Sequence, residues 1–321
     1  MRVLVTGANG FIGKVLIKKL LDRHFEVCVL SRSKDCCQEG VTAICGDLLI
    51  DDDRLLKAVT NCDVIFHCAG ELFDEQVMFD LHVTGTKNLL NAVSRSMRED
   101  RKAKHWIQLS SVGVYGPPVN PNASRIVSED TCLNPLGSYE VSKKLSDDLI
   151  INLANDLGIT FSILRPSNVV GLSMRNQSFA ALLSAIERRH FFYIGTKKSI
   201  ATYIHVDDLV NAMILCAVDD RAINQVFNLS NDCRLADIVS AINIANQKDD
   251  FVCIPEALVR LIVGVASLFK FSLLTRARVD ALVSKTTYSS AKIKDCLGVS
   301  FEYQIPDFAL QYMNYLNRNK L

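Results

Sequence analysis

The sequence predicts a doubly wound α/β fold, in which a parallel sheet carries helices on both faces, with a smaller α/β lobe toward the C-terminus. Through the first half of the 321 residues, short apolar runs that suit buried strands alternate with helical stretches. Such a rhythm gives right-handed βαβ crossovers and a parallel sheet. In addition, Gly7, Gly10 and Gly13 lie where the first strand gives way to the first helix, as in a Rossmann βα unit.

The expected elements follow this alternation. The strands of the first half are Arg2–Thr6, Val27–Leu30, Val41–Cys45, Val64–Ala69, Trp106–Ser110 and Thr160–Leu164. The helices between them are Lys14–Arg23, Arg54–Val59, Gln76–Met97 and Ser138–Leu157. The second half is less regular, with helices expected at Ser178–Arg189, Asp207–Val218 and Leu235–Gln247 and short strands at Phe191–Ile194 and Val226–Leu229.

The glycine turn predicts a dinucleotide site. Because glycines lack Cβ atoms, the backbone can approach a pyrophosphate there, and the start of the next helix offers free N–H groups and a positive dipole. An ordinary glycine turn is the alternative. We therefore expect residues 1–165 to bind NAD(P), and residues 166–321 to form mainly a substrate-binding lobe that is interleaved with the first part rather than cleanly separated.

The end of the second strand bears on the choice of cofactor. An acid about 20 residues past the glycines holds the ribose 2′-hydroxyl of NAD, whereas a nearby Arg accommodates the 2′-phosphate of NADP. This strand ends in Ser31 and Arg32, so we expect NADP in preference to NAD, although Asp35 could still reach the ribose. Asp47, after the third strand, suits either a contact with the adenine amine or a helix cap.

Charge and cysteine usage argue against several classes of function. The 36 basic and 35 acidic residues leave a formal net charge of +1, so nothing favours nucleic acid and a small ligand is the better expectation. The eleven cysteines lack the paired spacing of zinc sites, so we expect no metal. Reduced thiols, with no signal peptide before the first strand, predict a cytoplasmic protein.

The segment from Pro255 to Leu274 is apolar almost all round. Arg260 and Lys270 interrupt it, and Arg276 and Arg278 follow, so a transmembrane helix is not expected. We expect a buried helix pair that roofs the substrate pocket. Docking on a membrane surface is the alternative, since basic residues flank the apolar helix.

Tyr139 and Lys143 form a candidate catalytic pair, because their four-residue spacing places both on one helix face. A nearby ammonium lowers the pKa of a phenol from about 10, so Tyr139 is expected to exchange a proton near neutral pH. Ser111 follows the strand Trp106–Ser110, at the sheet edge where ligands bind. Its hydroxyl is a candidate to hold the reacting oxygen.

Together these residues resemble the extended short-chain dehydrogenase/reductase family, in its nucleotide-sugar epimerase/dehydratase branch. The order of the motifs carries the resemblance over nearly the whole chain: Thr6–Gly13, Gly46–Leu48, Asp63–Ala69, Val83–Leu90, Ser110–Gly116, Tyr139–Lys143, Arg165–Gly171, Tyr203–Leu209 and Phe227–Leu229. The resemblance implies a catalytic trio of Ser111, Tyr139 and Lys143, and implies that Lys143 also holds the nicotinamide ribose.

The resemblance also extends the expected binding residues. It implies that Ser111, Asn168 and Arg278 contact the substrate. With Arg32 and Asp47 from the argument above, the expected cofactor contacts are Gly7, Asn9, Gly10, Phe11, Ile12, Gly13, Arg32, Asp47, Leu48, Cys68, Ala69, Ser110, Tyr139, Lys143 and Pro166.

Departures from the family pattern reduce the number of reactions that the site is expected to catalyse. His82 stands where Asn is usual, and Ala201 where many epimerases carry Arg. The related 4,6-dehydratases place Asp-Glu after the catalytic hydroxyl residue, and the epimerase-reductases place Cys there, whereas Val112 and Gly113 follow Ser111. Neither residue can move a proton, so hydride exchange at one carbon, usually C4, remains.

We therefore expect a reductase of a nucleotide-linked 4-keto-sugar. A UDP-sugar 4-epimerase with bound NAD is the alternative. The apolar segment also suits a bulky apolar alcohol or a lipid-linked sugar as substrate, and some relatives are non-catalytic NADP-binding modules, although these usually lose the Tyr or the Lys. As is typical of the resembling family, we expect a homodimer formed through Gln76–Met97 and Ser138–Leu157.

Overall fold

The computed structural model describes residues 1–33, 39–100, 102, 104–120, 123–174, 177–268 and 275–318. Asp35 and the neighbouring Cys36 and Cys37 lie outside these ranges, as do Phe269 to Leu274 of the apolar segment.

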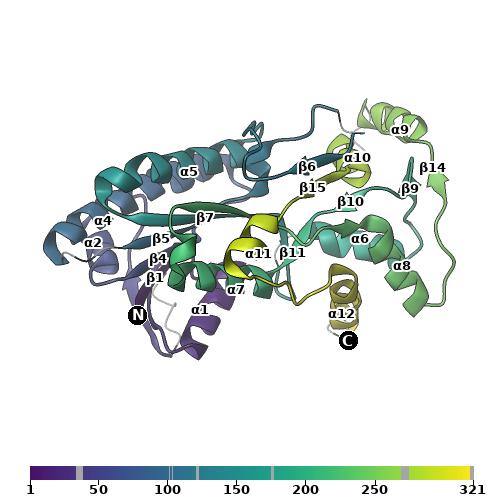
Figure 1. Cartoon of the computed structure of the whole chain (residues 1–321). Helices are drawn as coiled ribbons and strands as arrows, with labels where there is room; N and C mark the ends of the chain where they lie inside the picture. Colours follow the sequence, from purple (N-terminus) through teal and green to yellow (C-terminus); the bar gives the residue numbers. More distant parts are fainter. Residues whose placement is uncertain are drawn as a thin grey trace.

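A seven-stranded sheet forms the centre of the molecule (Figure 1), with the strand order β12-β7-β5-β4-β1-β2-β3. All its neighbouring strands run parallel. Their bounds are β1 (Arg2–Thr6), β2 (Glu26–Ser31), β3 (Val41–Cys45), β4 (Val64–His67), β5 (His105–Leu109), β7 (Thr160–Pro166) and β12 (Gln225–Leu229). The predicted doubly wound fold is confirmed, and every strand expected in the first half belongs to this sheet.

Helices cover both faces of the sheet, which explains why most of its strand residues are apolar. Leu16 and Leu209 represent the core on one face, and Leu89 and Ile150 represent the core on the other. The first face carries α1 (Phe11–Asp22), α7 (Val206–Val218) and α11 (Ala291–Leu297), and the second carries α2 (Asp53–Val59), α4 (Gly85–Asp100) and α5 (Ser138–Leu157). Since α7, α11 and β12 come from beyond residue 165, the two halves of the chain share this core.

The helix predicted over Gln76–Met97 is not continuous. It consists of α3 (Glu75–Phe79), a π-helical turn (Asp80–Thr84) and α4. In the π turn the buried His82 side chain bonds to Ser142 of α5, and the Thr86 hydroxyl donates to the carbonyl oxygen of His82. Such a turn inserts an extra residue into the helix, and here it coincides with a buried polar contact that periodicity cannot predict.

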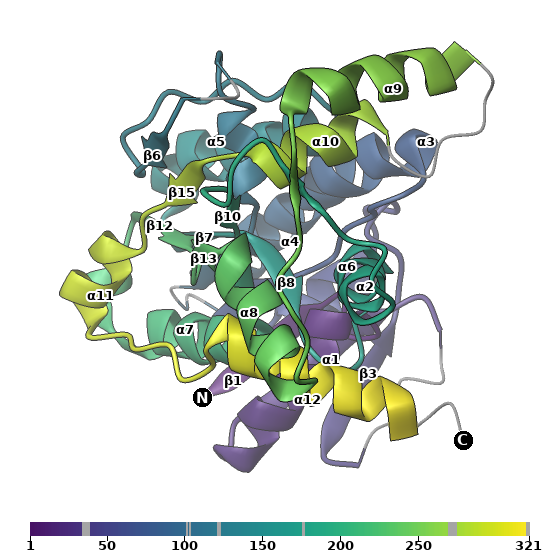
Figure 2. The same ribbon diagram turned by 90° about the vertical axis from the view of Figure 1, so that its right-hand side faces the viewer.

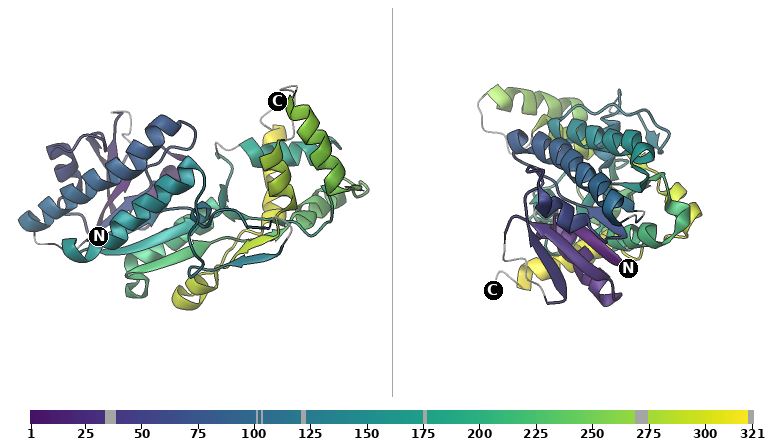
Figure 3. Two further views of the ribbon diagram at one scale, coloured as in Figure 1. Left: turned by 90° about the horizontal axis from the view of Figure 1, so that it is seen from above. Right: turned by 90° about the vertical axis from the view of Figure 1, so that its left-hand side faces the viewer.

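A further apolar cluster supports the C-terminal lobe. The helices of this lobe face the viewer in Figure 2 and lie at the right-hand end of the molecule in the left panel of Figure 3. The cluster joins α6 (Gln177–Glu187), α8 (Leu235–Ala245) and α12 (Ile305–Arg318). Short strands form four separate pairs outside the main sheet, namely β6 (Arg125–Val127) with β15 (Thr286–Tyr288), β8 (Asn168–Val170) with β11 (Tyr203–His205), β9 (Tyr193–Ile194) with β14 (Cys253–Ile254), and β10 (Ile200–Ala201) with β13 (Cys233–Arg234).

The apolar segment after Pro255 forms α9 (Glu256–Leu268), which packs beside α10 (Arg276–Val283). Only one face of α9 is buried, through Val259 and Val263. For the described part of the segment, the prediction of a buried helix pair is wrong. Four residues of α9 at helical spacing are 48% to 64% exposed, namely Leu258, Leu261, Ile262 and Val265. Among the described residues, no helix has the length and apolar character needed to cross a membrane.

Candidate active site

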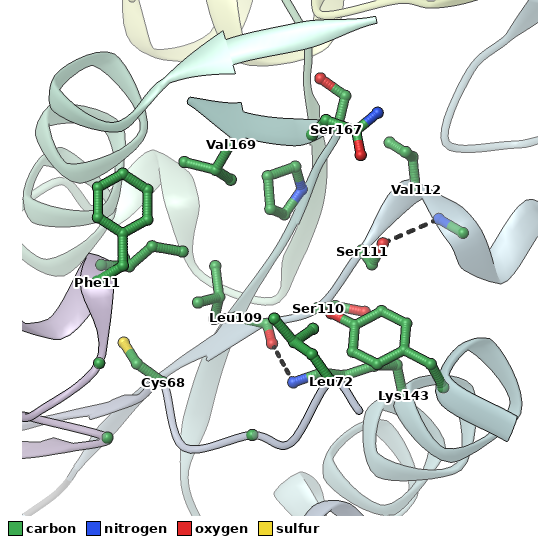
Figure 4. Close-up of a pocket in the computed structure, with 18 of the residues that line it drawn as sticks. Phe11, Cys68, Leu72, Leu109, Ser110, Ser111, Val112, Lys143, Ser167 and Val169 are labelled. Carbon is green, nitrogen blue, oxygen red and sulfur yellow. Dashed lines mark hydrogen bonds between the residues drawn. The ribbon is translucent and has the colours of Figure 1, made fainter. Parts of the chain in front are cut away.

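A cavity of about 530 Å³ lies at the carboxyl ends of the parallel strands (Figure 4). Parallel α/β sheets bind ligands at this edge, where the strand order reverses; here the reversal falls between β1 and β4. Of the site residues predicted from sequence, those that line the cavity are Gly7, Gly10, Phe11, Ile12, Gly13, Cys68, Ser110, Ser111, Tyr139, Lys143, Pro166 and Asn168. Those that do not line it are Asn9, Arg32, Asp47, Leu48, Ala69 and Arg278.

The glycine turn brings β1, β4 and α1 into close contact. Gly7 has a φ of +69°, and a Cβ there would lie 2.7 Å from the backbone of Cys68 and Ala69. A Cβ at Gly13 would collide with the Gly7 carbonyl oxygen. Because the N-cap Gly10 carries no side chain to bond the first N–H groups of α1, this cradle fits a pyrophosphate.

The expected adenosine contacts lie beside the turn. Asn9 Nδ2 donates to Ser31 Oγ at 3.2 Å, which ties the turn to the end of β2. Arg32 follows and is exposed. Asp47 Oδ1 accepts from the backbone N–H of Leu49, whereas Asp52 caps α2. The cap alternative for Asp47 is therefore wrong for α2, and its predicted adenine contact stays a prediction.

The three candidate catalytic side chains converge on the cavity. Lys143 is buried, and its Nζ donates to the carbonyl oxygen of Leu109 at 3.0 Å, as the dashed line in Figure 4 shows. The same nitrogen lies 6.0 Å from the centroid of the Tyr139 ring. Ser111 Oγ accepts from the N–H of Gly113 and so caps the short helix that follows β5. The structure thus brings Ser111, Tyr139 and Lys143 together.

Burial shifts the pKa values of Tyr139 and Lys143 and so determines their protonation. It raises the pKa of Tyr139 to about 12, the negative charge of Glu140 adds to the rise, and an interaction with the Ser111 side chain opposes it. Burial lowers the pKa of Lys143 to about 8. The expected lowering of the Tyr139 pKa is therefore wrong for this structure, because desolvation of the phenolate outweighs the ammonium. Tyr139 is a protonated group at neutral pH and is suited to donate.

His82 lies beside Tyr139. Its Nε2 accepts from the N–H of Glu71 at 3.0 Å, so Nδ1 carries the proton and donates to Ser142 Oγ at 2.8 Å. Ser142 Oγ in turn donates to the Tyr139 carbonyl oxygen, and the His82 and Tyr139 rings meet edge to face. His82 therefore joins the loop after β4 to the first turn of α5.

The buried histidines predict a loss of stability in acid. Burial lowers the pKa of His82 to about 2 and that of His67 to about 3, with the Lys143 charge adding to both shifts. Below pH 6.5 these histidines take up protons in the unfolded chain but stay neutral in the folded protein. Their contribution to the free energy of unfolding is therefore complete above that pH. Each histidine then removes about 1.4 kcal/mol per pH unit as the pH falls toward its folded pKa.

Urea unfolding at several pH values between 7.5 and 4.5 measures this slope. We expect His82→Gln to make the free energy of unfolding fall less steeply with pH, by the contribution of one histidine. His190→Gln changes an exposed histidine and is the matched control. Equal slopes for wild type and His82→Gln would contradict the expectation.

A buried ion pair that sequence reasoning missed anchors α5 beneath the site. Asp147 Oδ2 accepts from Ser110 Oγ at 2.8 Å and from the Arg165 guanidinium at 3.3 Å. Arg165 Nη1 donates to the Tyr115 hydroxyl, which donates to Asn228 in β12. A signal was present, because Asp147 follows Tyr139 and Lys143 at the same four-residue spacing and so shares their helix face.

The side of the cavity at which substrate contacts were expected draws on distant segments. Asn168 lines it and donates to the carbonyl oxygen of Thr202 at 3.1 Å. Thr202 and Tyr288 line it too, and no local motif marks either residue. Arg278 lies exposed on α10, outside the cavity lining. None of the described residues of α9 lines the cavity, so the expectation that this helix roofs the pocket is not met. No group of His, Cys, Asp or Glu within the described ranges has the geometry of a metal site.

Comparison with known proteins identifies a family whose model matches most of the chain. A model of the "NAD dependent epimerase/dehydratase family" matches residues 3–230. Cinnamoyl-CoA reductase 1 of Petunia hybrida is 26% identical over 234 residues, covering 66% of this chain and 68% of that protein. The decarboxylating sterol-4-alpha-carboxylate 3-dehydrogenase of Dictyostelium discoideum is 26% identical over 240 residues, covering 71% of each chain.

Solved structures share the fold. UDP-glucuronic acid 4-epimerase from Bacillus cereus, solved with NAD, has a TM-score of 0.73 at 21% identity, covering 99% of this chain and 97% of that one. RMD from Pseudomonas aeruginosa, solved with NADPH, has a TM-score of 0.68 at 18% identity, covering 98% of each chain.

Proposed function

This chain belongs to the NAD-dependent epimerase/dehydratase family, and we propose that it transfers a hydride at C4 of a nucleotide-activated sugar, as a reductase of a 4-keto-sugar. Two features of the cavity support this proposal. Ser111, Tyr139 and Lys143 line it together, and Val112 and Gly113 follow Ser111. Neither of these two residues moves a proton, so elimination of water lacks its acid and base at these positions. Reduction at one carbon needs a single proton donor.

The protein's share of this reaction follows from the geometry. A bound nicotinamide dinucleotide supplies the hydride. Tyr139, protonated at neutral pH, donates its proton to the oxygen of the reduced carbon. Ser111 Oγ orients that oxygen, and Lys143, fixed by the Leu109 carbonyl, holds the ribose. The glycine turn and the start of α1 hold the pyrophosphate.

The cofactor is NAD or NADP, and we propose NADP because Arg32 directly follows β2. Arg32→Asp should weaken NADPH binding about tenfold or more, since a charge-assisted contact to the 2′-phosphate is lost, and leave NADH binding within a factor of about three. Fluorescence titration of both dinucleotides measures this. Arg98→Asp makes the same charge change at an exposed position of α4 and is the control. An unchanged NADPH affinity in Arg32→Asp would remove Arg32 from the site.

One experiment tests the proposed reaction. The cofactor that copurifies is released and identified, and NADPH is then added with a panel of 4-keto and 4-hydroxy nucleotide sugars. We expect NADPH consumption that depends on a 4-keto-sugar. Tightly held NAD with no NADPH consumption would overturn the reductase and favour the 4-epimerase, which needs the same three residues.

Assembly and location stay predictions from the sequence. A homodimer through the α3–α4 segment and α5 would bring the exposed Ile151 of α5 to an interface. A light-scattering mass of one chain at working concentration would contradict it.

A further inference from the structure

Glu140 is the residue of the cavity whose role the proposed reaction leaves open. It follows Tyr139 in the first turn of α5 and lines the catalytic cavity. It also lines an adjoining cavity of about 360 Å³, which shares Gly113, Thr202 and Tyr288 with the first. Glu140 therefore stands at the junction between the catalytic centre and a second space.

Two glycines leave room for this side chain. A Cβ at Gly113 would lie 2.7 Å from Glu140 Cγ and 3.3 Å from Ser111 Oγ. A Cβ at Gly137 would collide with Glu140 Oε2. The Glu140 side chain thus fills space that a side chain at Gly113 or Gly137 would occupy. Its Cγ lies beside Gly113, near the Ser111 hydroxyl, its Oε2 lies beside Gly137, and the residue lines both cavities.

The carboxylate has no partner to hold it for a structural purpose. Among the described residues it makes no hydrogen bond or ion pair, unlike Asp147 and Asp52, whose oxygens are bonded. Its charge contributes to the high pKa of Tyr139. Of the described residues that line either cavity, Lys143 is the only cation, and its ammonium is bonded to Leu109.

We propose that Glu140 is a specificity-determining residue, which accepts a hydrogen bond from a hydroxyl, amide or ammonium substituent of the sugar ring and rejects a ring that carries a carboxylate. This inference rests on the proposed function. A carboxylate accepts hydrogen bonds only. A second carboxylate beside it is repelled because Lys143 is the only cation among the described lining residues, and its ammonium is bonded to Leu109. In a reaction at one carbon, Glu140 has no ring proton to remove, so recognition is its use.

Binding of a matched pair of ligands tests the proposal. UDP-glucose and UDP-glucuronic acid differ by the ring carboxylate, and calorimetric titration of each into the full-length, NADP-saturated protein measures affinity without turnover. We expect wild type to prefer UDP-glucose by about tenfold or more. Glu140→Gln should reduce the preference to within about threefold, whereas Glu140→Asp, which keeps the charge, should retain it. Glu99→Gln removes an exposed charge on α4 and is the control.

The outcomes separate this inference from the proposed function. If neither ligand binds wild type, the nucleotide-sugar proposal fails and the role of Glu140 with it. If both bind and Glu140→Gln leaves their ratio unchanged, only the role of Glu140 is overturned. A lower melting temperature with an unchanged ratio would assign Glu140 to stabilising the start of α5. Glu140-dependent uptake of solvent deuterium at C3 or C5 would make it a base instead, and would also overturn the proposal.

Discussion

Tyr139→Phe should lower kcat by about two to four orders of magnitude, the usual contribution of a positioned general acid. The substitution removes one hydroxyl, and the Lys143 bond to the Leu109 carbonyl does not depend on it. Cofactor affinity should therefore stay within about threefold, and the free energy of unfolding within about 1.5 kcal/mol, the net worth of one hydrogen bond. Single-turnover reduction monitored by NADPH absorbance measures the loss of turnover, and urea unfolding measures the free energy of unfolding.

Tyr315→Phe is the matched control, because Tyr315 lies exposed on α12, away from the cavity lining. Both variants lose a phenol, and only Tyr139→Phe should lose turnover. A Tyr139→Phe protein with wild-type kcat would show that another group donates the proton. If the cellular role also survived the substitution intact, a non-catalytic NADP-binding module would be the better account of the chain.

The fold, and the placing of Tyr139 and Lys143 at one cavity, were predictable because their signals are local. A glycine turn between a strand and a helix specifies its own geometry, and the spacing of Tyr139 and Lys143 fixes one helix face. The family resemblance drawn from the order of motifs is confirmed by the family match over residues 3–230. Val226–Leu229 was recognisable as a strand, but its place in the main sheet depends on pairing with β7, which lies far away in the sequence.

The parts that sequence could not predict depend on burial and on long-range contacts. Thr202 and Tyr288 reach the cavity from separate segments of the C-terminal half. The pKa of Tyr139 depends on how completely the ring is desolvated, which the Tyr139–Lys143 spacing cannot report. Likewise, the apolar composition of α9 did not reveal that Leu261 and its neighbours face outward, since composition carries no information about which partner covers a helix.

The pair of Asp147 and Arg165 gives the largest expected effect on stability. Both side chains are almost wholly buried, and Arg165 donates through Nε and Nη2 to Asp147 Oδ2. Asp147→Asn keeps the shape but leaves the guanidinium in the core without its counter-charge, and should cost about 3–5 kcal/mol of unfolding free energy. The neighbouring Lys143 also loses a charge that raises its pKa, so the pKa of Lys143 should fall below its present value of about 8.

The double variant Asp147→Leu/Arg165→Met identifies the cause. If the loss comes from an unpaired buried charge, replacing both groups by apolar side chains of similar volume should recover much of it, because the desolvation cost of the pair disappears as well. Guanidinium unfolding of wild type, Asp147→Leu, Arg165→Met and the double variant completes the double-mutant cycle. A double variant as unstable as the sum of the singles would show instead that the hydrogen bonds to Ser110 and Tyr115, and not the charge, hold α5 beneath the catalytic cavity.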